Sequence, residues 1–205
     1  MSENVATTEP PKKAPRGRPR SVETRRRILI AAAAVIKERG FADVRVSDIA
    51  EAAGTSTGLV IYHFKTLDAV LIEALRLSEE EFRKAAERII GAHDKQRDRF
   101  VELVRWVFEP EEDLLGGWAL WIETWSQALR HEEIAQARAD ADEAWRDLLK
   151  SVWDREGSAE ADAFAHTVGA ILDGFTIQVA LDDSAVTPQV AIELTLRVAD
   201  GIFGW

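Results

Sequence analysis

The sequence contains no cysteine, and it has only one methionine and one tyrosine in 205 residues. Without cysteine, disulfide bonds and thiolate metal sites are excluded, and a reducing cytoplasm is the natural setting. The longest uninterrupted apolar run, ILIAAAAVI, has nine residues and is too short to span a bilayer. No apolar core and cleavage site follow the charged N-terminus, so we expect no secretion signal and a cytoplasmic protein.

Signatures of catalysis are also missing from the sequence. It has no nucleophile elbow, no phosphate-binding loop, no dinucleotide fingerprint and no metal-spaced set of His and Glu. Paired acids such as Glu111 and Glu112 are typical of a solvated surface, and His63 has no second metal ligand at helical spacing. We therefore expect a protein that is not an enzyme and that has no cofactor or metal.

The distribution of charge is the first positive feature. Residues 1–65 hold 12 basic and 7 acidic residues, whereas residues 66–205 hold 14 basic and 29 acidic residues. The whole chain has a net charge of −10 and would be repelled by nucleic acid, so only the basic N-terminal part is a plausible DNA contact surface. The alternative is that this basic part is simply solvated, and charge alone does not decide between the two.

Apolar residues recur at helical spacing along the chain, and no alternating strand pattern or internal repeat is visible. Ser21 and Thr66 have the chemistry of N-caps, Gly40 that of a helix end, and Pro188 suits a first helical turn. We predict an all-α fold. The expected helices cover about 21–39, 47–53, 56–63, 67–82, 100–108, 118–129, 144–153, 163–181 and 189–203.

The segment VSDIAEAAGTSTGLVIYHF has the pattern of a helix-turn-helix motif. Gly54 can adopt the left-handed conformation that the sharp turn needs. The second helix opens with small residues, Ser56, Thr57 and Gly58, whose hydroxyl and backbone N–H groups suit phosphate oxygens. Leu59 is suited to contact thymine methyl groups.

These features divide the chain into three parts. The first is a disordered basic arm, the second an N-terminal three-helix helix-turn-helix domain, and the third a C-terminal helical domain for ligand binding and dimerisation. The boundaries that we expect are 1–20, 21–66 and 67–205.

Residues from about Thr24 to Leu75 resemble the DNA-binding domain of the tetracycline-repressor (TetR) family. The landmarks are TRRRILIAAAAVIKERGF, then DIAEAAGTSTG, then YHF and LDAVLIEAL, in the order and spacing of that family. The resemblance implies a bacterial homodimeric regulator. Such a regulator is usually a repressor that a small ligand releases from double-stranded operator DNA.

The same resemblance assigns roles to residues of the first and third helices. Positions at the start of the first helix contact phosphates, those at the start of the third read bases, and its aromatic end contacts the DNA backbone. The matching residues are Thr24 and Arg25, then Thr57, Gly58 and Leu59, then Tyr62 and His63 with Lys65 close behind. Phe64 matches a buried aromatic residue that packs the motif onto the domain.

Three places depart from the family's pattern. Ile61 stands where Tyr is common, and Leu67 stands where a lysine is often found. Val44 and Arg45 replace the usual hydroxyl residues before the second helix, which leaves Ser47 as the only obvious cap and a further expected DNA contact. The departures concern individual phosphate contacts and not the motif.

The sequence RGRPR precedes the first helix and resembles the core of an AT-hook. Arginine favours the narrow minor groove of A·T-rich DNA, and glycine and proline keep such a strand extended. We expect Arg16 and Arg18 to contact the groove, against the alternative of a merely solvated arm.

All seven tryptophans lie in the acidic half, and Trp118, Trp121 and Trp125 are spaced i, i+3, i+7 with Glu123 between the last two. Aromatic faces with a nearby carboxylate can hold a cation. The segments WALWIETW and ILDGFTIQVALD make this half similar to the choline-responsive repressors of the betaine pathway, which suggests a cationic effector such as a quaternary ammonium or a polyamine. The alternative is that the tryptophans only fill a core or a subunit seam.

Asp173 lies in an apolar helix between Leu172 and Phe175, and we expect it either to contact the ligand or to bond to a neighbouring helix or water. Gln178 and His166 on the same helix are weaker candidates for the ligand site.

Two apolar faces near the C-terminus favour a homodimer. In the TetR family the last two helices meet their symmetry mates in a four-helix bundle. The expected faces are Ala165, Val168, Leu172, Phe175 and Val179 on one helix, and Ala191, Leu194, Val198 and Ile202 on the other. We expect a dimer that binds a palindromic operator, with the long helix after Thr66 linking ligand to DNA. An activator, or an architectural protein that coats A·T-rich DNA without an effector, stays open as an alternative.

Overall fold

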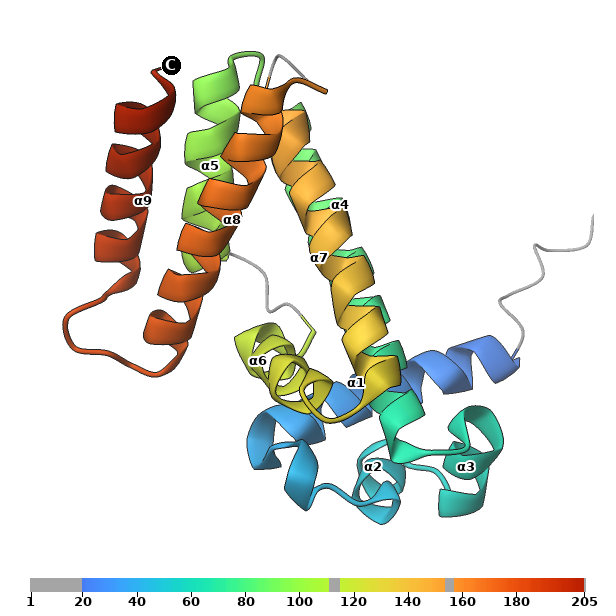
Figure 1. Ribbon diagram of the computed structural model, residues 1–205. Helices are drawn as coiled ribbons and strands as arrows, with labels where there is room; N and C mark the ends of the chain where they lie inside the picture. The colour runs from blue at the N-terminus through green and yellow to red at the C-terminus, as the bar shows by residue number, and fades with distance from the viewer. Residues whose placement is uncertain (1–19, 111–114, 154–156, 205) are drawn as a thin grey trace, which may run out of the picture.

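A computed structural model describes residues 20–110, 115–153 and 157–204. Every regular element within these ranges is helical, which confirms the all-α prediction (Figure 1). The elements are α1 (Arg20–Arg39), the 3-10 turn η1 (Phe41–Asp43), α2 (Val46–Ala52), α3 (Thr57–Phe64), α4 (Leu67–Gly91), α5 (Gln96–Phe108), α6 (Gly117–Ala128), α7 (Glu132–Val152), α8 (Ala159–Ala180) and α9 (Pro188–Phe203).

Three predicted helix starts and one predicted helix end are confirmed. The hydroxyls of Ser56 and Thr66 cap α3 and α4 by accepting hydrogen bonds from backbone N–H groups three residues on, at 3.2 and 3.1 Å. Pro188 opens α9, where its missing N–H leaves no hydrogen bond unmade. Gly40 follows the last residue of α1 with φ +74°, a conformation that glycine adopts without strain.

Two predicted caps are wrong. Ser21 lies inside α1, which begins one residue earlier at Arg20. Ser47 lies inside α2, whose N-cap is Arg45. The backbone N–H of Arg45 donates to the carboxylate of Asp48 at 2.8 Å, so an acid in the first turn takes the place of a capping hydroxyl.

Two long helices, α4 and α7, pack along each other and connect the two ends of the molecule (Figure 1). With 25 residues α4 is about 37 Å long. Its first turns bury Leu71 and Leu75 against α1 and α7, and its last turns bury Ala86 and Ile90 in the C-terminal domain. The helix therefore contributes to both hydrophobic cores. The sequence predicted only the second half of α7, because its first half reads as alternating alanine and acid.

The first core belongs to the helix-turn-helix domain, but it does not end at the predicted boundary at residue 66. Most of its apolar side chains come from α1–α4. The buried side chains there include Ile28, Ala32, Ile36, Ile49, Val60, Phe64, Leu71 and Leu75. Leu120 of α6 and Ile134 and Ala137 of α7 are buried in the same cluster. Helices of the second domain thus complete the core of the first.

The second core lies among α5, α7, α8 and α9, with the C-terminal end of α4. Phe100 and Phe164 meet edge-to-face at its centre, with ring centroids 5.4 Å apart. All five residues of the stripe predicted for α5 are buried there, which confirms that prediction. They are Phe100, Leu103, Val104, Val107 and Phe108.

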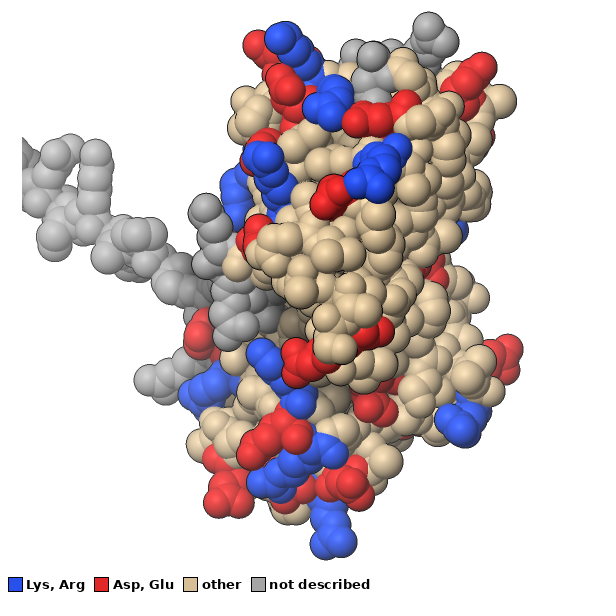
Figure 2. Space-filling view, turned by 90° about the vertical axis from the view of Figure 1, so that its left-hand side faces the viewer, with Lys and Arg blue, Asp and Glu red and all other residues tan. Residues whose placement is uncertain are grey.

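The outer side of α8 and α9 carries apolar residues that this core does not use. By length and composition α8 is apolar enough to cross a membrane, and only 33% of its most apolar 18-residue window is buried. Four residues of the predicted partner-facing faces are instead buried in the second core, because they lie on the sides of α8 and α9 that pack within it. They are Ala165, Val168, Leu172 and Ala191. On α9, Val198 and Ile202 remain 39% and 58% exposed. Figure 2 shows a broad surface on the α9 side with few charged side chains.

Candidate DNA-binding surface and ligand cavity

The turn between α2 and α3 has the geometry that the motif predicts. Gly54 adopts the left-handed conformation with φ +58°. The backbone N–H of Thr55 then donates to the carbonyl of Ala50 at 2.9 Å, which closes the turn. Because the hydroxyl of Ser56 caps α3, its first role is to start the helix, and a contact from it to a phosphate stays a prediction.

Helix α3 buries one face and presents the other to solvent. Val60 and Phe64 are buried in the first core, as predicted for Phe64. Thr57 and Gly58 are exposed at the start of the helix, and Tyr62 is 70% exposed near its end. A helix exposed in this way can enter a DNA groove. Leu59 is half-buried at the edge of this face, and Ile61 is 43% exposed.

The end of α3 gathers aromatic and basic side chains. The ammonium group of Lys65 lies 5.6 Å from the Tyr62 ring centroid and donates to the Tyr62 carbonyl at 3.3 Å. The rings of Tyr62 and His63 meet edge-on with centroids 5.3 Å apart. Lys65 itself has φ +67°, a conformation that costs free energy for a residue with a Cβ. This conformation turns the chain sharply between α3 and α4 and leaves the lysine exposed.

Arg25 has packing partners that the sequence did not reveal. Its guanidinium lies 4.9 Å from the Phe64 ring centroid and forms an ion pair with Glu73 at 3.2 Å. These contacts join α1 to α3 and α4. A phosphate would therefore compete with Glu73 for Arg25, and the predicted contact stays a prediction. Thr24 beside it is half-buried.

The other expected DNA contacts are Ser47 on α2 and two arginines of the N-terminal arm. Ser47 is exposed on α2 although it is not the cap of that helix. Arg16 and Arg18 lie outside the described residues.

A cavity of about 610 Å³ lies where α6 and α8 face α4, α7 and the end of α1. Four aromatic side chains form much of its wall, namely Phe82, Trp118, Trp121 and Trp145. Ile36 and Lys37 of α1, and Gly40 directly after it, also line the cavity. A ligand in this cavity would touch the DNA-binding domain directly.

Four of the six predicted ligand residues line this cavity, namely Trp118, Trp121, Glu123 and Asp173. Trp125 does not, although its ring lies 5.0 Å from that of Trp121 and shares its side of α6. Seven residues after Trp118 it stands about 10 Å further along the helix, beyond the cavity and 37% exposed. Gln178 also lies outside the lining, and its amide donates to the Gly174 carbonyl of its own helix at 3.2 Å.

Three aromatic or acidic residues of the cavity were missed from the sequence. Phe82 was read as part of an apolar helix face, whereas its ring lies 5.3 Å from Trp145 and 6.4 Å from Trp118. Trp145 and Glu79 complete the wall from α7 and α4. The signal that could have found them is aromatic residues on three separate helices, but their meeting depends on how those helices cross.

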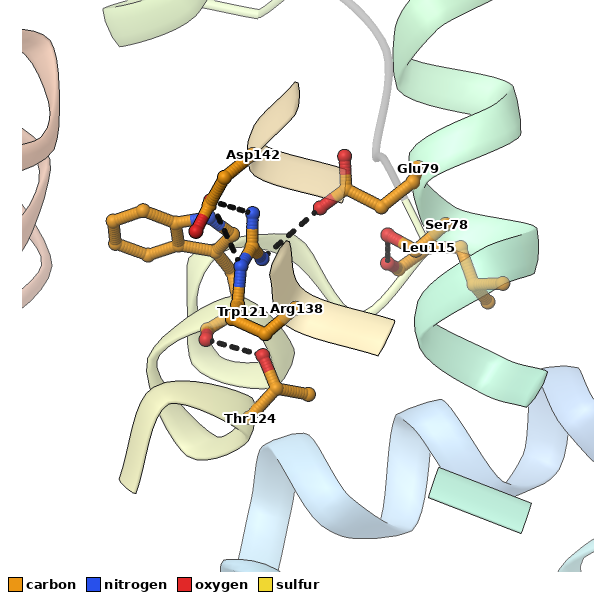
Figure 3. Close-up of polar contacts among 7 residues, drawn as sticks. All are labelled: Ser78, Glu79, Leu115, Trp121, Thr124, Arg138 and Asp142. Atoms are coloured by element: carbon orange, nitrogen blue, oxygen red, sulfur yellow. Dashed lines mark hydrogen bonds and ion pairs between the residues drawn. The ribbon is translucent and has the colours of Figure 1, made fainter. Parts of the chain in front are cut away.

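A buried arginine lies behind the cavity wall (Figure 3). Arg138 of α7 is 5% exposed, and its guanidinium bonds to Glu79 at 3.3 Å and to Asp142 at 3.0 Å. It also lies 5.7 Å from the Trp121 ring centroid. One side chain thus joins α4, α6 and α7, and its charge is compensated by two carboxylates.

Two hydroxyl contacts fix the segment around α6 (Figure 3). Ser78 donates to the Leu115 carbonyl at 2.7 Å, which ties α4 to the residues before α6. Thr124 is fully buried and donates to the Trp121 carbonyl, also at 2.7 Å.

The acidic side chains of the cavity differ in how far a nearby positive charge balances their negative charge. Burial raises the pKa of Glu79, while Arg138 opposes the rise. Burial also raises the pKa of Asp173 to about 6, with a further increase from Asp142 and a decrease from Arg138. Within the described part of the chain, no Lys or Arg forms an ion pair with Asp173. Asp173 is therefore a partly buried acid of the cavity without an ion-pair partner among the described residues.

The fold and these two sites define the class, which is a helix-turn-helix DNA-binding regulator with a ligand-binding domain. Residues 28–74 match the family described as bacterial regulatory proteins of the tetR family. Residues 96–204 match the family described as BetI-type transcriptional repressor, C-terminal. The chain belongs to the TetR family of transcriptional regulators and carries a C-terminal domain of the BetI type.

Two sequence relatives and one solved structure are similar to this chain over most of its length. The HTH-type transcriptional regulator BetI of Rhizobium meliloti is 27% identical over 173 residues, which are 83% of this chain and 85% of that protein. The protein of the same name from Stenotrophomonas maltophilia is 27% identical over 179 residues, 86% and 89% of the two chains. A transcriptional regulator from Saccharomonospora viridis, crystallised in complex with choline, superposes with a TM-score of 0.77 at 26% identity, covering 89% of this chain and 97% of its own.

Proposed function

We propose that the protein is a cytoplasmic repressor that binds a palindromic operator as a homodimer and is released by a small cationic effector. The observation that carries the proposal is the cavity itself. It combines aromatic walls and the uncompensated carboxyl of Asp173 with residues of α1, so one space connects effector chemistry to the DNA-binding domain. An architectural protein has no need of such a cavity, which favours a regulator.

The proposed dimer uses the outer faces of α8 and α9. These faces carry exposed apolar residues such as Val198 and Ile202 and few charges. Apolar surface of this kind is stabilised when a second copy covers it. A two-fold axis there would hold two α3 helices about 34–36 Å apart, one turn of DNA.

The proposed effector is a cation because the cavity offers it two kinds of contact. Trp118, Trp121 and Trp145 present ring surfaces, and Asp173 offers a negative charge. Arg138 lowers the pKa of Asp173 but forms no ion pair with it, because its guanidinium bonds to Glu79 and Asp142. The relative from Saccharomonospora viridis holds choline, a quaternary ammonium alcohol. Aromatic rings with a carboxylate recognise ions of that kind.

Release from DNA requires that the effector prefers one shape of the dimer over another. Ile36 and Gly40 line the cavity at the end of α1. Helix α4 runs from the cavity to its own N-cap residue, Thr66, which follows α3 closely in the chain. An effector that spreads these walls shifts the two α3 helices relative to each other and weakens operator binding.

The test pairs ligand binding with DNA binding on the full chain. Selection from a random duplex library identifies the operator, and choline and tetramethylammonium are then titrated by tryptophan fluorescence beside a gel-shift assay. We expect both ions to bind the wild type, at least one to release DNA, and Asp173→Asn to lose binding while retaining DNA affinity. A monomeric protein that ignores duplexes at low salt would contradict the DNA-binding half of the proposal. Tight cation binding that never alters DNA affinity would contradict the release.

A further inference from the structure

The cavity is much larger than a minimal quaternary ammonium ion. Its volume is about 610 Å³. A cavity of about 150 Å³ is enough for benzene, and choline has about as many heavy atoms as benzene. Choline alone would therefore leave most of this cavity to be filled by water or by closure of the walls.

The lining changes character along the cavity. Near Asp173, the aromatic rings and the carboxyl groups of Asp173 and Glu79 suit a charged head. From there the lining follows α8 through Leu172, Thr176 and Ala180 to Leu181. Ala180 lies seven residues after Asp173, which is about 10 Å along the helix. Most of the lining along this path is apolar.

The far part of the cavity borders the DNA-binding domain. Ile36 and Lys37 of α1 and the following Gly40 line it together with Ile122 and Glu123 of α6. A Cβ placed on Gly40 would lie 3.7 Å from a carboxylate oxygen of Glu123, so α6 and α1 approach closely here. The carboxylate of Glu123 accepts a hydrogen bond from the Gln127 amide at 3.0 Å, and the cationic side chain of Lys37 belongs to the same lining, so this end is less suited than the Asp173 end to a cationic group.

From this arrangement we propose that the effector is an amphiphilic cation, with one ammonium head at Asp173 and an apolar body that extends along α8 towards α1. The proposal rests on the proposed function, because it describes the ligand of the same cavity. The length of the body then decides the response. A short cation occupies the aromatic end alone, whereas a long one also contacts Ile36 and Gly40 and acts on α1.

The experiment uses n-alkyltrimethylammonium ions from methyl to octyl, below their micellar concentrations, with the full-length protein and its operator. Burial of each methylene in the cavity should lower Kd about fourfold, or about 200-fold from butyl to octyl. We expect operator release to increase with the same chain lengths. Octanol and octyl sulfate carry the same tail without the cation and should bind far more weakly. If either binds as tightly as the octyl cation, the assigned head group is wrong.

Matched variants locate the tail. Ala180 lines the cavity on the path of the tail, whereas Ala139 is exposed on α7 outside it. We expect Ala180→Phe to weaken octyltrimethylammonium binding at least tenfold while tetramethylammonium binding stays the same. Ala139→Phe should change neither. If Ala180→Phe binds the octyl ion like the wild type, the tail does not lie along α8.

Three further outcomes separate this inference from the proposed function. If tetramethylammonium binds and releases the operator but longer tails give no gain, the amphiphilic ligand is refuted and the proposed function stands. If no ion in the series binds, the cationic effector itself is refuted. If a bis-quaternary ion binds tenfold tighter than an equally long single-headed ion, and Glu123→Gln removes that gain, the ligand has two heads and the single-headed assignment is overturned.

Discussion

The buried guanidinium of Arg138 provides the strictest test of the packing around the cavity. Replacing it in Arg138→Met keeps the length of the side chain and removes its charge. The Arg138 side chain is 7% exposed, and its partners Glu79 and Asp142 are 27% and 34% exposed. Removing one partner of a buried ion pair costs about 3–5 kcal/mol. Because both carboxylates keep some access to water, we expect the lower end, about 3 kcal/mol or roughly 150-fold in the folding equilibrium.

The loss of stability should depend on pH in a defined direction. Burial already raises the pKa of Glu79 above its ordinary 4.5, and Arg138 opposes this rise. Without Arg138 the pKa of Glu79 rises further. A carboxyl group whose folded pKa is raised adds stability below its unfolded pKa, and that stability is lost as pH rises through the folded pKa. The variant should therefore be most destabilised at pH 8 and less so at pH 5.

Urea unfolding at these two pH values, followed by tryptophan fluorescence at one fixed protein concentration, measures the effect. Adding Glu79→Gln should restore part of the stability, since it removes one uncompensated charge. Arg105→Met is the surface control, because Arg105 is 58% exposed in its pair with Glu102, and we expect little change from it. If Arg138→Met is as stable as the wild type at pH 8, or loses the same stability at both pH values, the reasoning is refuted.

Three other predictions concern the cavity, the shared core and the DNA surface. Cation affinity should rise as pH increases through about 6, the raised pKa of Asp173, because the ionised carboxylate holds the cation; calorimetry on the wild type at pH 5 and pH 8 measures this, and equal affinity at both would contradict it. Leu120→Ala should cost about 3 kcal/mol in urea unfolding and also weaken operator binding, since Leu120 is 1% exposed in the core of the DNA-binding domain. If DNA affinity survives that loss, the shared core does not support α3. Lys65→Gln should weaken binding to all duplexes about equally and reduce the salt slope by about one, and a sequence-dependent loss would show that Lys65 reads bases instead.

Local chemistry is what the sequence predicted well. The turn at Gly54, the caps at Ser56 and Thr66 and the opening of α9 at Pro188 each depend on a few neighbouring residues. Ser47 shows where this reasoning stops, because a carboxylate three residues after the cap position took over the role expected of a hydroxyl.

Contacts between distant segments are what it could not predict. Arg138 lies in the stretch ARADADEA, which reads as a solvated helix face, and its partner Glu79 is 59 residues away in the chain. Its burial exists only because α4, α6 and α7 cross at that point. In the same way, the tryptophan spacing on α6 predicted the correct side of the helix for Trp118 and Trp121. It held no information on how far the cavity extends, and Trp125 falls beyond its end.

The interior that α6 and α7 share with α1–α4 limits how regulators of this kind can recombine. Leu120, Ile134 and Ala137 are as enclosed as the residues of α1–α4 in the same core. A chimaera joined at residue 66 would set these side chains against a foreign neighbour and leave a mismatched interface between α1 and α6. A new effector specificity is thus more readily acquired by substitutions on the cavity side of α6 and α8 than by exchange of whole sensor modules.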